Sequence, residues 1–158
     1  MAKANALKLP FPDNSFDIVI TRHTLEQMPK IYQEALDEIF RVSKHHVILF
    51  EPSFEMGSLA QKIKMLNTDY VRGIPAYINN KKNLKVEKPY LMNNSANPLN
   101  HTACYRATSE QADVSKSEKD IIPFVCPITN SPLQNCGSYF YSSKAKRAYP
   151  IIEGIPVL

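Results

Sequence analysis

The sequence is poor in the residues that build nucleotide cradles and disulfide frameworks. Only four of its 158 residues are glycine, and no two of them are close enough for a G-x-G-x-G turn or a P-loop. The three cysteines are too few for a disulfide framework, which favours a reducing compartment. This sequence therefore contains no glycine-rich phosphate or nucleotide cradle.

Long apolar runs and strong charge are also missing. The longest clean apolar runs have about five residues, whereas a membrane-spanning helix needs about 20, and the first ten residues lack the apolar core of a secretion signal. The formal net charge is only +4, and no run of basic residues exceeds two. We therefore expect a cytoplasmic, globular protein without a membrane span and without a strong nucleic-acid signal.

The first third of the chain has the pattern of a strand, a helix and a second strand. Turn residues precede the β-branched run Phe16–Ile20, which predicts a buried strand. Apolar residues recur in pairs every four residues across Ile31–Val42, which places one stripe on a helix. The run His46–Phe50 predicts the second strand. Two such strands joined through a helix should be parallel, with helices on both faces of the sheet.

Ligands of open parallel sheets bind beyond the carboxyl ends of the strands. Here the first strand is followed by Thr21, Arg22 and His23, and the second by Glu51, Pro52 and Ser53. A small doubly wound domain that binds no ligand fits the same pattern.

The middle of the chain predicts a helix over Ser58–Val71 that packs on the sheet through an apolar stripe made of Leu59, Ile63, Leu66 and Tyr70. A helix on a membrane surface is the alternative, supported only by Lys62 and Lys64.

Two later segments alternate in the strand period, and a polar segment follows them. Leu84–Val86 and Ala103–Ala107 are predicted to form an antiparallel pair. Residues 109–120 are predicted to be a linker. The linker separates a first part, residues 1–108, from an apolar tail, residues 121–158.

The stretch Asn5–Val19, which contains L-P-F-P-D-N-S-F-D, resembles class I S-adenosylmethionine-dependent methyltransferases. The segments His23–Glu26, Ile39–Val42 and Val47–Pro52 follow in the order found in that family. The resemblance covers about 50 residues and implies the C-terminal half of a methyltransferase domain. The implied fold class is α/β: a partial Rossmann-like sheet of parallel strands plus an antiparallel pair.

The same resemblance implies a site for the cofactor S-adenosylmethionine. Six residues would line it: Asn5, Ala6 and Leu7 on the adenine side, and Thr21, Arg22 and His23 beside the methionine part. An alternative for His23 is packing at a helix entry. The glycine-rich loop and the acidic ribose-binding residue of the family are missing from this sequence, so we expect weak cofactor binding, or none, by this chain alone.

The tail resembles a second family, the small zinc-ribbon-like proteins that activate methyltransferases. The resemblance spans about 35 residues, ends in Y-P-I-I-E-G-I-P-V-L, and implies a β-rich module with a hairpin around Tyr139–Tyr149. Thr129 stands where a second cysteine would complete a C-x-x-C pair with Cys126. No zinc site is therefore predicted, and Cys126 is expected to be a small, buried hydrophobic residue.

Two functional hypotheses follow. The first is an S-adenosylmethionine-dependent methyltransferase, or its C-terminal fragment, with an unknown methyl acceptor. No catalytic residue can be assigned, because methyl transfer from a sulfonium mainly requires alignment. The second is a non-catalytic adaptor or activator-like protein that docks through residues 121–158, so whether the chain is an enzyme stays open. In both cases the edge of Phe16–Ile20 should be open, and we expect self-association or a partner chain there.

Overall fold

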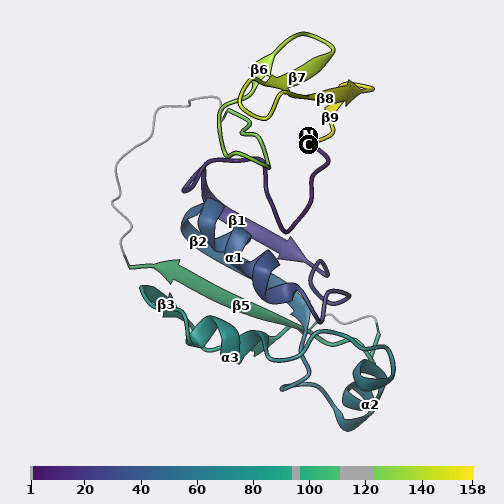
Figure 1. The fold of residues 1–158 in the computed structure, drawn as a ribbon. Helices are drawn as coiled ribbons and strands as arrows, with labels where there is room; N and C mark the ends of the chain where they lie inside the picture. The colour runs from purple at the N-terminus through teal and green to yellow at the C-terminus, as the bar shows by residue number, and fades with distance from the viewer. Residues whose placement is uncertain (1, 94–96, 111–122) are drawn as a thin grey trace.

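The computed structural model describes residues 2–93, 97–110 and 123–158. These residues form a mixed α/β structure with one mixed sheet and one smaller antiparallel sheet (Figure 1). The elements are β1 (Phe16–Arg22), α1 (Tyr32–Val42), β2 (Ser43–Pro52), α2 (Leu59–Asn67), α3 (Ile74–Asn79), β3 (Leu84–Val86), β4 (Tyr90–Leu91), β5 (Thr102–Ser109), β6 (Gln134–Asn135), β7 (Tyr139–Ser142), β8 (Arg147–Ile152) and β9 (Ile155–Pro156). The predicted linker begins at Ser109, the last residue of β5, and from residue 111 it lies outside the described residues.

The strand–helix–strand unit forms as predicted. β1 and β2 are neighbouring parallel strands, with Ile20 opposite Ile48 and Arg22 opposite Phe50. Both strands extend two residues beyond their predicted carboxyl ends, to Arg22 and Pro52. These extensions bring the residues after the predicted strands into the sheet itself.

The antiparallel part of the sheet is also confirmed. β5 lies between β2 and β3 and is antiparallel to both, and β4 pairs with β5 as well. The prediction of an antiparallel pair from Leu84–Val86 and Ala103–Ala107 is therefore correct.

The main core lies between one face of this sheet and the helices α1 and α3 (Figure 1). Alternate residues of β2 and β5 point into it, as the two-residue period of a strand requires. Burying these apolar side chains supplies most of the stabilisation of this part of the chain. The buried members of the core are Leu25, Tyr32, Ala35, Leu36, Ile39, Val47, Leu49, Val71, Ile74, Ile78, Ala103 and Tyr105.

The opposite face of the sheet corrects a prediction. Helices were expected on both faces, but no helix among the described residues packs on the face that carries Ile18 and Ile20, which are 51% and 61% exposed. Ile48, the cross-strand partner of Ile20, and the nearby Phe50 are only partly buried. The physical reason is that α1 covers one face only, while α3 packs on that same side. β1 is also an edge strand, with β2 as its one strand partner in the described chain.

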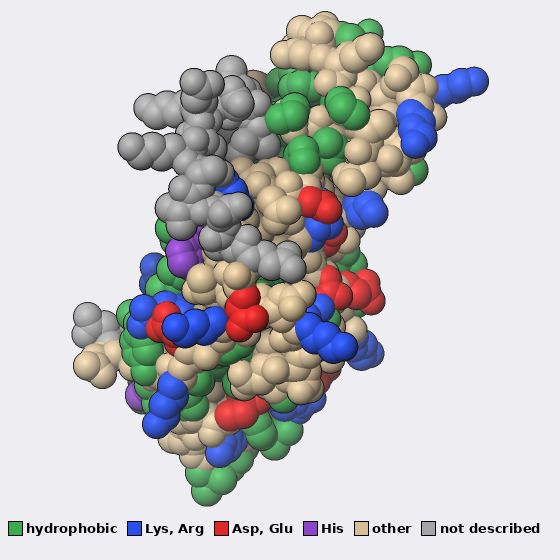
Figure 2. Space-filling model, turned by 90° about the vertical axis from the view of Figure 1, so that its left-hand side faces the viewer, with side chains coloured by type: hydrophobic (Ala, Val, Ile, Leu, Met, Phe, Trp, Pro, Cys, Tyr) green, Lys and Arg blue, Asp and Glu red, His purple; other side chains and the backbone are tan. Residues whose placement is uncertain are grey.

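The orientation of α2 is a second correction. The predicted stripe does not pack on the sheet: Leu59 is 75% exposed, and Ile63 and Leu66 are 52% exposed. The buried residues of α2 are instead Gln61 and Met65, on the other side of the helix. Figure 2 shows hydrophobic side chains gathered at the lower end of the molecule, where Figure 1 places α2. The helix also ends at Asn67, earlier than predicted.

The small sheet has the order β6-β7-β8-β9, and β7 and β8 form the predicted hairpin. The N-terminal segment joins this sheet: the Lys3 N–H donates to the carbonyl of Pro156, and the Leu158 N–H donates to the carbonyl of Lys3. The two chain ends therefore lie together (Figure 1). Phe11 and Phe124, with ring centroids 5.6 Å apart, extend this contact between the first part of the chain and the tail.

Candidate functional site

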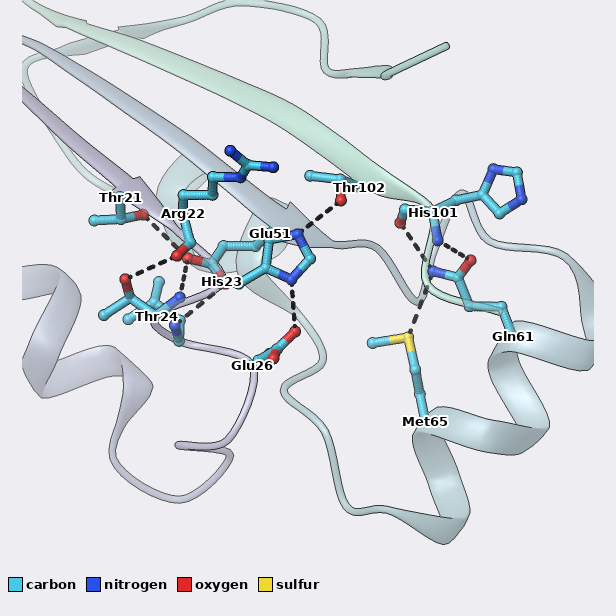
Figure 3. A network of polar contacts seen from close by, with 11 residues as sticks. Thr21, Arg22, His23, Thr24, Glu26, Glu51, Gln61, Met65, His101 and Thr102 are labelled. Carbon is cyan, nitrogen blue, oxygen red and sulfur yellow. Dashed lines mark hydrogen bonds and ion pairs between the residues drawn. The ribbon is translucent and has the colours of Figure 1, made fainter. Parts of the chain in front are cut away.

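A buried carboxylate lies where β2 ends beside the loop that follows β1. Glu51 is fully buried, and its side chain accepts hydrogen bonds from the Thr24 N–H at 3.0 Å, the Leu25 N–H at 3.2 Å and the Thr21 hydroxyl at 3.1 Å (Figure 3). Burial raises the pKa of Glu51, and these donors oppose the rise. The carboxylate therefore fixes the path of the loop after β1.

His23 begins that loop with a backbone conformation that residues other than glycine rarely adopt. Its φ is 51°, and its N–H donates to the carbonyl of Phe50 at 2.9 Å. The ring is held from both sides: Nδ1 lies 2.9 Å from Glu26 Oε2, and Nε2 lies 2.9 Å from Thr102 Oγ1 (Figure 3). This bridge from β1 to the start of β5 explains how the left-handed backbone is maintained.

The amide of Gln61 ties α2 to the same end of the sheet. Its Nε2 donates to the carbonyls of Ser53 and His101, at 3.1 and 3.0 Å, and its Oε1 accepts the His101 N–H at 2.8 Å. A Cβ on Gly57 would lie 2.6 Å from the carbonyl oxygen of Ser53, so only glycine fits there. These contacts explain why the polar Gln61, rather than the apolar stripe, is the buried side of α2.

A small hollow opens beside this network. It has a volume of about 290 Å³ and is lined by Arg22, Phe50, Met92 and Thr102. Its volume is at the lower end for ligand pockets. One guanidinium, one hydroxyl and two apolar side chains suit a small ligand, or part of one, with both an apolar and a polar or anionic portion.

The structure brings three of the six implied cofactor residues together. Thr21, Arg22 and His23 lie at the end of β1, where Thr21 is hydrogen-bonded to Glu51 and Arg22 lines the hollow. His23 makes the ring contacts described above in the loop between β1 and α1, and α1 begins only at Tyr32.

The other three implied residues lie in a turn of the N-terminal segment. The side-chain oxygen of Asn5 accepts the Leu7 N–H at 3.0 Å within this turn, and Leu7 packs against the core. Ala6 is partly buried. The side-chain oxygen of Asn5, which the resemblance assigns to adenine, thus already accepts a hydrogen bond within the turn. Of the six implied residues, only Arg22 lines the hollow.

Sequence reasoning missed most of the contacts that hold the site. It placed Glu51 at the end of the second predicted strand but did not assign the hydrogen bonds that Glu51 accepts. Glu26 and Gln61 gave no local signal for their contacts. Thr102 is 79 residues from His23, and nothing in either segment indicates that they meet.

The surroundings of Cys126 differ from the prediction. The thiol is fully buried, as expected, but it lies among polar groups, with Tyr149 Oη at 3.2 Å from Sγ. Burial raises its pKa, but hydrogen bonds from Ser142, Thr129 and Tyr149 outweigh this and lower it to about 6. Cys126 is therefore a hydrogen-bonded polar group and not a hydrophobic one. Within the described chain, no group of three or more His, Cys, Asp or Glu side chains is placed to hold a metal ion.

Comparison with known proteins gives a match to the first part of the chain. Residues 1–50 match the model of a family described as "Methyltransferase domain". Over 48 residues the chain is 48% identical to an uncharacterized protein of Haemophilus influenzae, a region that makes up 30% of this chain and 19% of that relative. The family match covers β1, α1 and most of β2 and supports a class I methyltransferase domain for this part. The resemblance of the tail to zinc-ribbon-like activators stays a prediction.

Proposed function

We propose that this chain acts in S-adenosylmethionine-dependent methyl transfer, with residues 1–108 as a partial methyltransferase domain and residues 121–158 as an activator-like module. One observation supports this most strongly. The segment that matches the methyltransferase family folds as a parallel strand–helix–strand unit, and the carboxyl ends of its strands carry Arg22, His23 and Glu51. Ligands of open α/β sheets bind at such ends.

In this proposal the residues at the strand ends hold the loop and the hollow in place and take no part in the chemical reaction. Glu51 holds the loop after β1, His23 joins that loop to Thr102, and Arg22 faces the hollow. When bound, S-adenosylmethionine itself supplies the reactive methyl group, so the protein mainly aligns the acceptor with it. The methyl acceptor is unassigned, and a cytoplasmic location remains part of the proposal.

The test is an NMR titration of the isotope-labelled 158-residue chain with S-adenosylmethionine. Amide chemical shifts detect binding even in the millimolar range, where the incomplete site should lie. We expect shifts in two separate segments, Asn5–Leu7 and Thr21–His23. No change in either segment at near-saturating cofactor would overturn the proposal, and micromolar affinity would contradict the view that the site is incomplete.

A matched pair of variants makes this test specific. Arg22→Ala removes the one implied residue that faces the hollow, and should at least halve the shift changes at Thr21 and His23. Arg147→Ala removes an exposed arginine of β8 and should leave the titration unchanged. If the two substitutions reduced the shift changes equally, the cofactor would be interacting unspecifically with exposed arginines and not with the hollow.

The second candidate function is a non-catalytic adaptor. The scarcity of glycine favours it, because four glycines without a G-x-G spacing provide no nucleotide cradle in this chain. An adaptor would show no shift at Asn5–Leu7 or Thr21–His23 with the cofactor. It would instead bind a partner chain through the tail, residues 121–158.

A further inference from the structure

The outward face of α2 is an apolar stripe that nothing in the described chain covers. At about 100° per residue, Leu59, Ile63 and Leu66 lie within about 60° of the helix circumference. The fixed side is opposite: Met65 is buried and Gln61 is bonded to backbone groups of two other segments. The stripe therefore points away from the body of the protein and cannot rotate inward without breaking these bonds.

Two lysines held over aromatic rings accompany the stripe. Lys62 Nζ lies 5.8 Å from the ring centroid of Phe54, and Lys64 Nζ lies 5.3 Å from that of Tyr70. Both lysines are only partly exposed along their length. An apolar stripe combined with lysine and aromatic side chains is typical of helices that lie in a membrane interface.

The charged residues of α2 itself are all of one sign. The helix itself, L-A-Q-K-I-K-M-L-N, contains no acidic residue. The nearest acidic side chains in sequence are engaged elsewhere: Glu55 accepts the Gly73 N–H at 2.8 Å, and Asp69 pairs with Arg72 at 3.2 Å. A partner that fits this helix has an apolar interior for the stripe and anionic groups at its surface for the lysines. The headgroup boundary of an anionic bilayer has both.

We propose that α2 docks this protein reversibly on an anionic lipid bilayer, with Leu59, Ile63 and Leu66 inserted below the headgroups and Lys62 and Lys64 among them. This is peripheral contact. None of the helices in the described residues has both the length and the apolar character to span a bilayer. The proposal goes beyond methyl transfer and holds whether or not the chain binds S-adenosylmethionine.

Because the sequence contains no tryptophan, a single introduced tryptophan is a site-specific fluorescent probe. Leu59→Trp places a single indole on the stripe, and Ile128→Trp places one at a similarly exposed position of the tail, where Ile128 is 60% exposed. Both full-length variants are mixed with phosphatidylcholine vesicles containing phosphatidylglycerol, with and without brominated acyl chains. We expect a blue shift and bromine quenching for Leu59→Trp, and neither for Ile128→Trp.

Vesicle flotation of the unlabelled chain supplies the second measurement. Binding to phosphatidylglycerol-containing vesicles should fall at least tenfold in the Leu59→Ser/Ile63→Ser variant, and also in high salt or with phosphatidylcholine alone. The Ile128→Ser/Ile152→Ser variant should bind as well as the wild type. No flotation of the wild-type chain, or equal loss in both double variants, would overturn the proposal. Circular dichroism of both variants checks that the substituted, exposed positions leave the fold intact.

Discussion

At the scale of single residues, one ion pair explains why the Leu-Pro-Phe stretch lies where it does. Arg41 of α1 donates from Nη2 to the carbonyl of Leu9 at 3.0 Å and from Nη1 to that of Phe11 at 2.8 Å. Glu38 completes the set by accepting the Leu9 N–H at 2.7 Å and the Arg41 Nε–H at 2.7 Å. Two motif segments that carry the methyltransferase resemblance, L-P-F and F-R-V, therefore contact each other in the fold.

Substituting Glu38 should produce a pH-dependent loss of stability. Burial raises the pKa of Glu38, but hydrogen bonds from Arg41 and the Leu9 N–H outweigh this and lower it from 4.5. A lowered folded-state pKa gives stability that is complete above the unfolded value and lost as pH falls through the folded one. Glu38→Gln should therefore cost about 2 kcal/mol at neutral pH and much less once the pH has fallen through the lowered folded-state pKa of Glu38.

Urea unfolding of wild type and variant at several pH values measures this difference. Glu34→Gln is the control, because Glu34 belongs to the same helix but is exposed. It should change the free energy of unfolding by about 0.5 kcal/mol or less at every pH. A constant penalty for Glu38→Gln from neutral to acid would show that its charge is not what holds the L-P-F stretch.

At the scale of elements, the sequence predicted what depends on local periodicity. The period of Ile31–Val42 and the apolar runs around it were sufficient for α1, β1, β2 and the parallel order of the strands. α1 and β2 bury most of the residues that the pattern marks, whereas Ile18 and Ile20 of β1 stay half exposed. The same reasoning placed Thr21–His23 at the carboxyl end of the first strand, although Thr21 and Arg22 belong to β1 itself.

The sequence could not predict which way α2 faces. A period of 3.6 residues marks a stripe but does not say whether the core or solvent contacts it. What decides the orientation is the amide of Gln61, which bonds His101, 40 residues away. The site depends on similar long-range contacts, such as that of His23 with Thr102, for which neither segment carries a local pattern.

Two adjacent residues test the observed orientation of α2. Met65 is fully buried, so Met65→Ala should lower the free energy of unfolding by about 2–5 kcal/mol. Leu66 is 52% exposed, and Leu66→Ala should cost about 0.5 kcal/mol or less. Thermal or urea unfolding measures both. The reverse ranking would mean that the stripe predicted from the sequence is the packed side after all.

At the scale of the whole molecule, the described residues cover one face of the sheet and leave the other face, and the edge of β1 beside it, without a helix or a further strand. Parallel strands normally occur with both faces covered. Here β1, which is parallel to β2, carries Ile18 and Ile20 half exposed on the outer strand. Apolar side chains next to unpaired strand edges promote association with other chains. The core is therefore buried, but the exposed apolar side chains of β1 form a surface to which another chain could bind.

We accordingly expect the chain to self-associate through β1 in a concentration-dependent way. Ile18→Lys/Ile20→Lys adds charge to the bare face and should shift the sedimentation coefficient distribution towards monomer, because desolvating two lysines opposes any apolar contact there.

Ile128→Lys/Ile152→Lys is the control, because these two residues of the tail are 60% and 58% exposed and the substitutions add the same charge. It should leave the distribution as in the wild type. A wild-type chain that sediments as a single monomer at all concentrations, with high thermal stability, would contradict the prediction. Loss of association in both double variants would assign it to general apolar exposure and not to the face of β1.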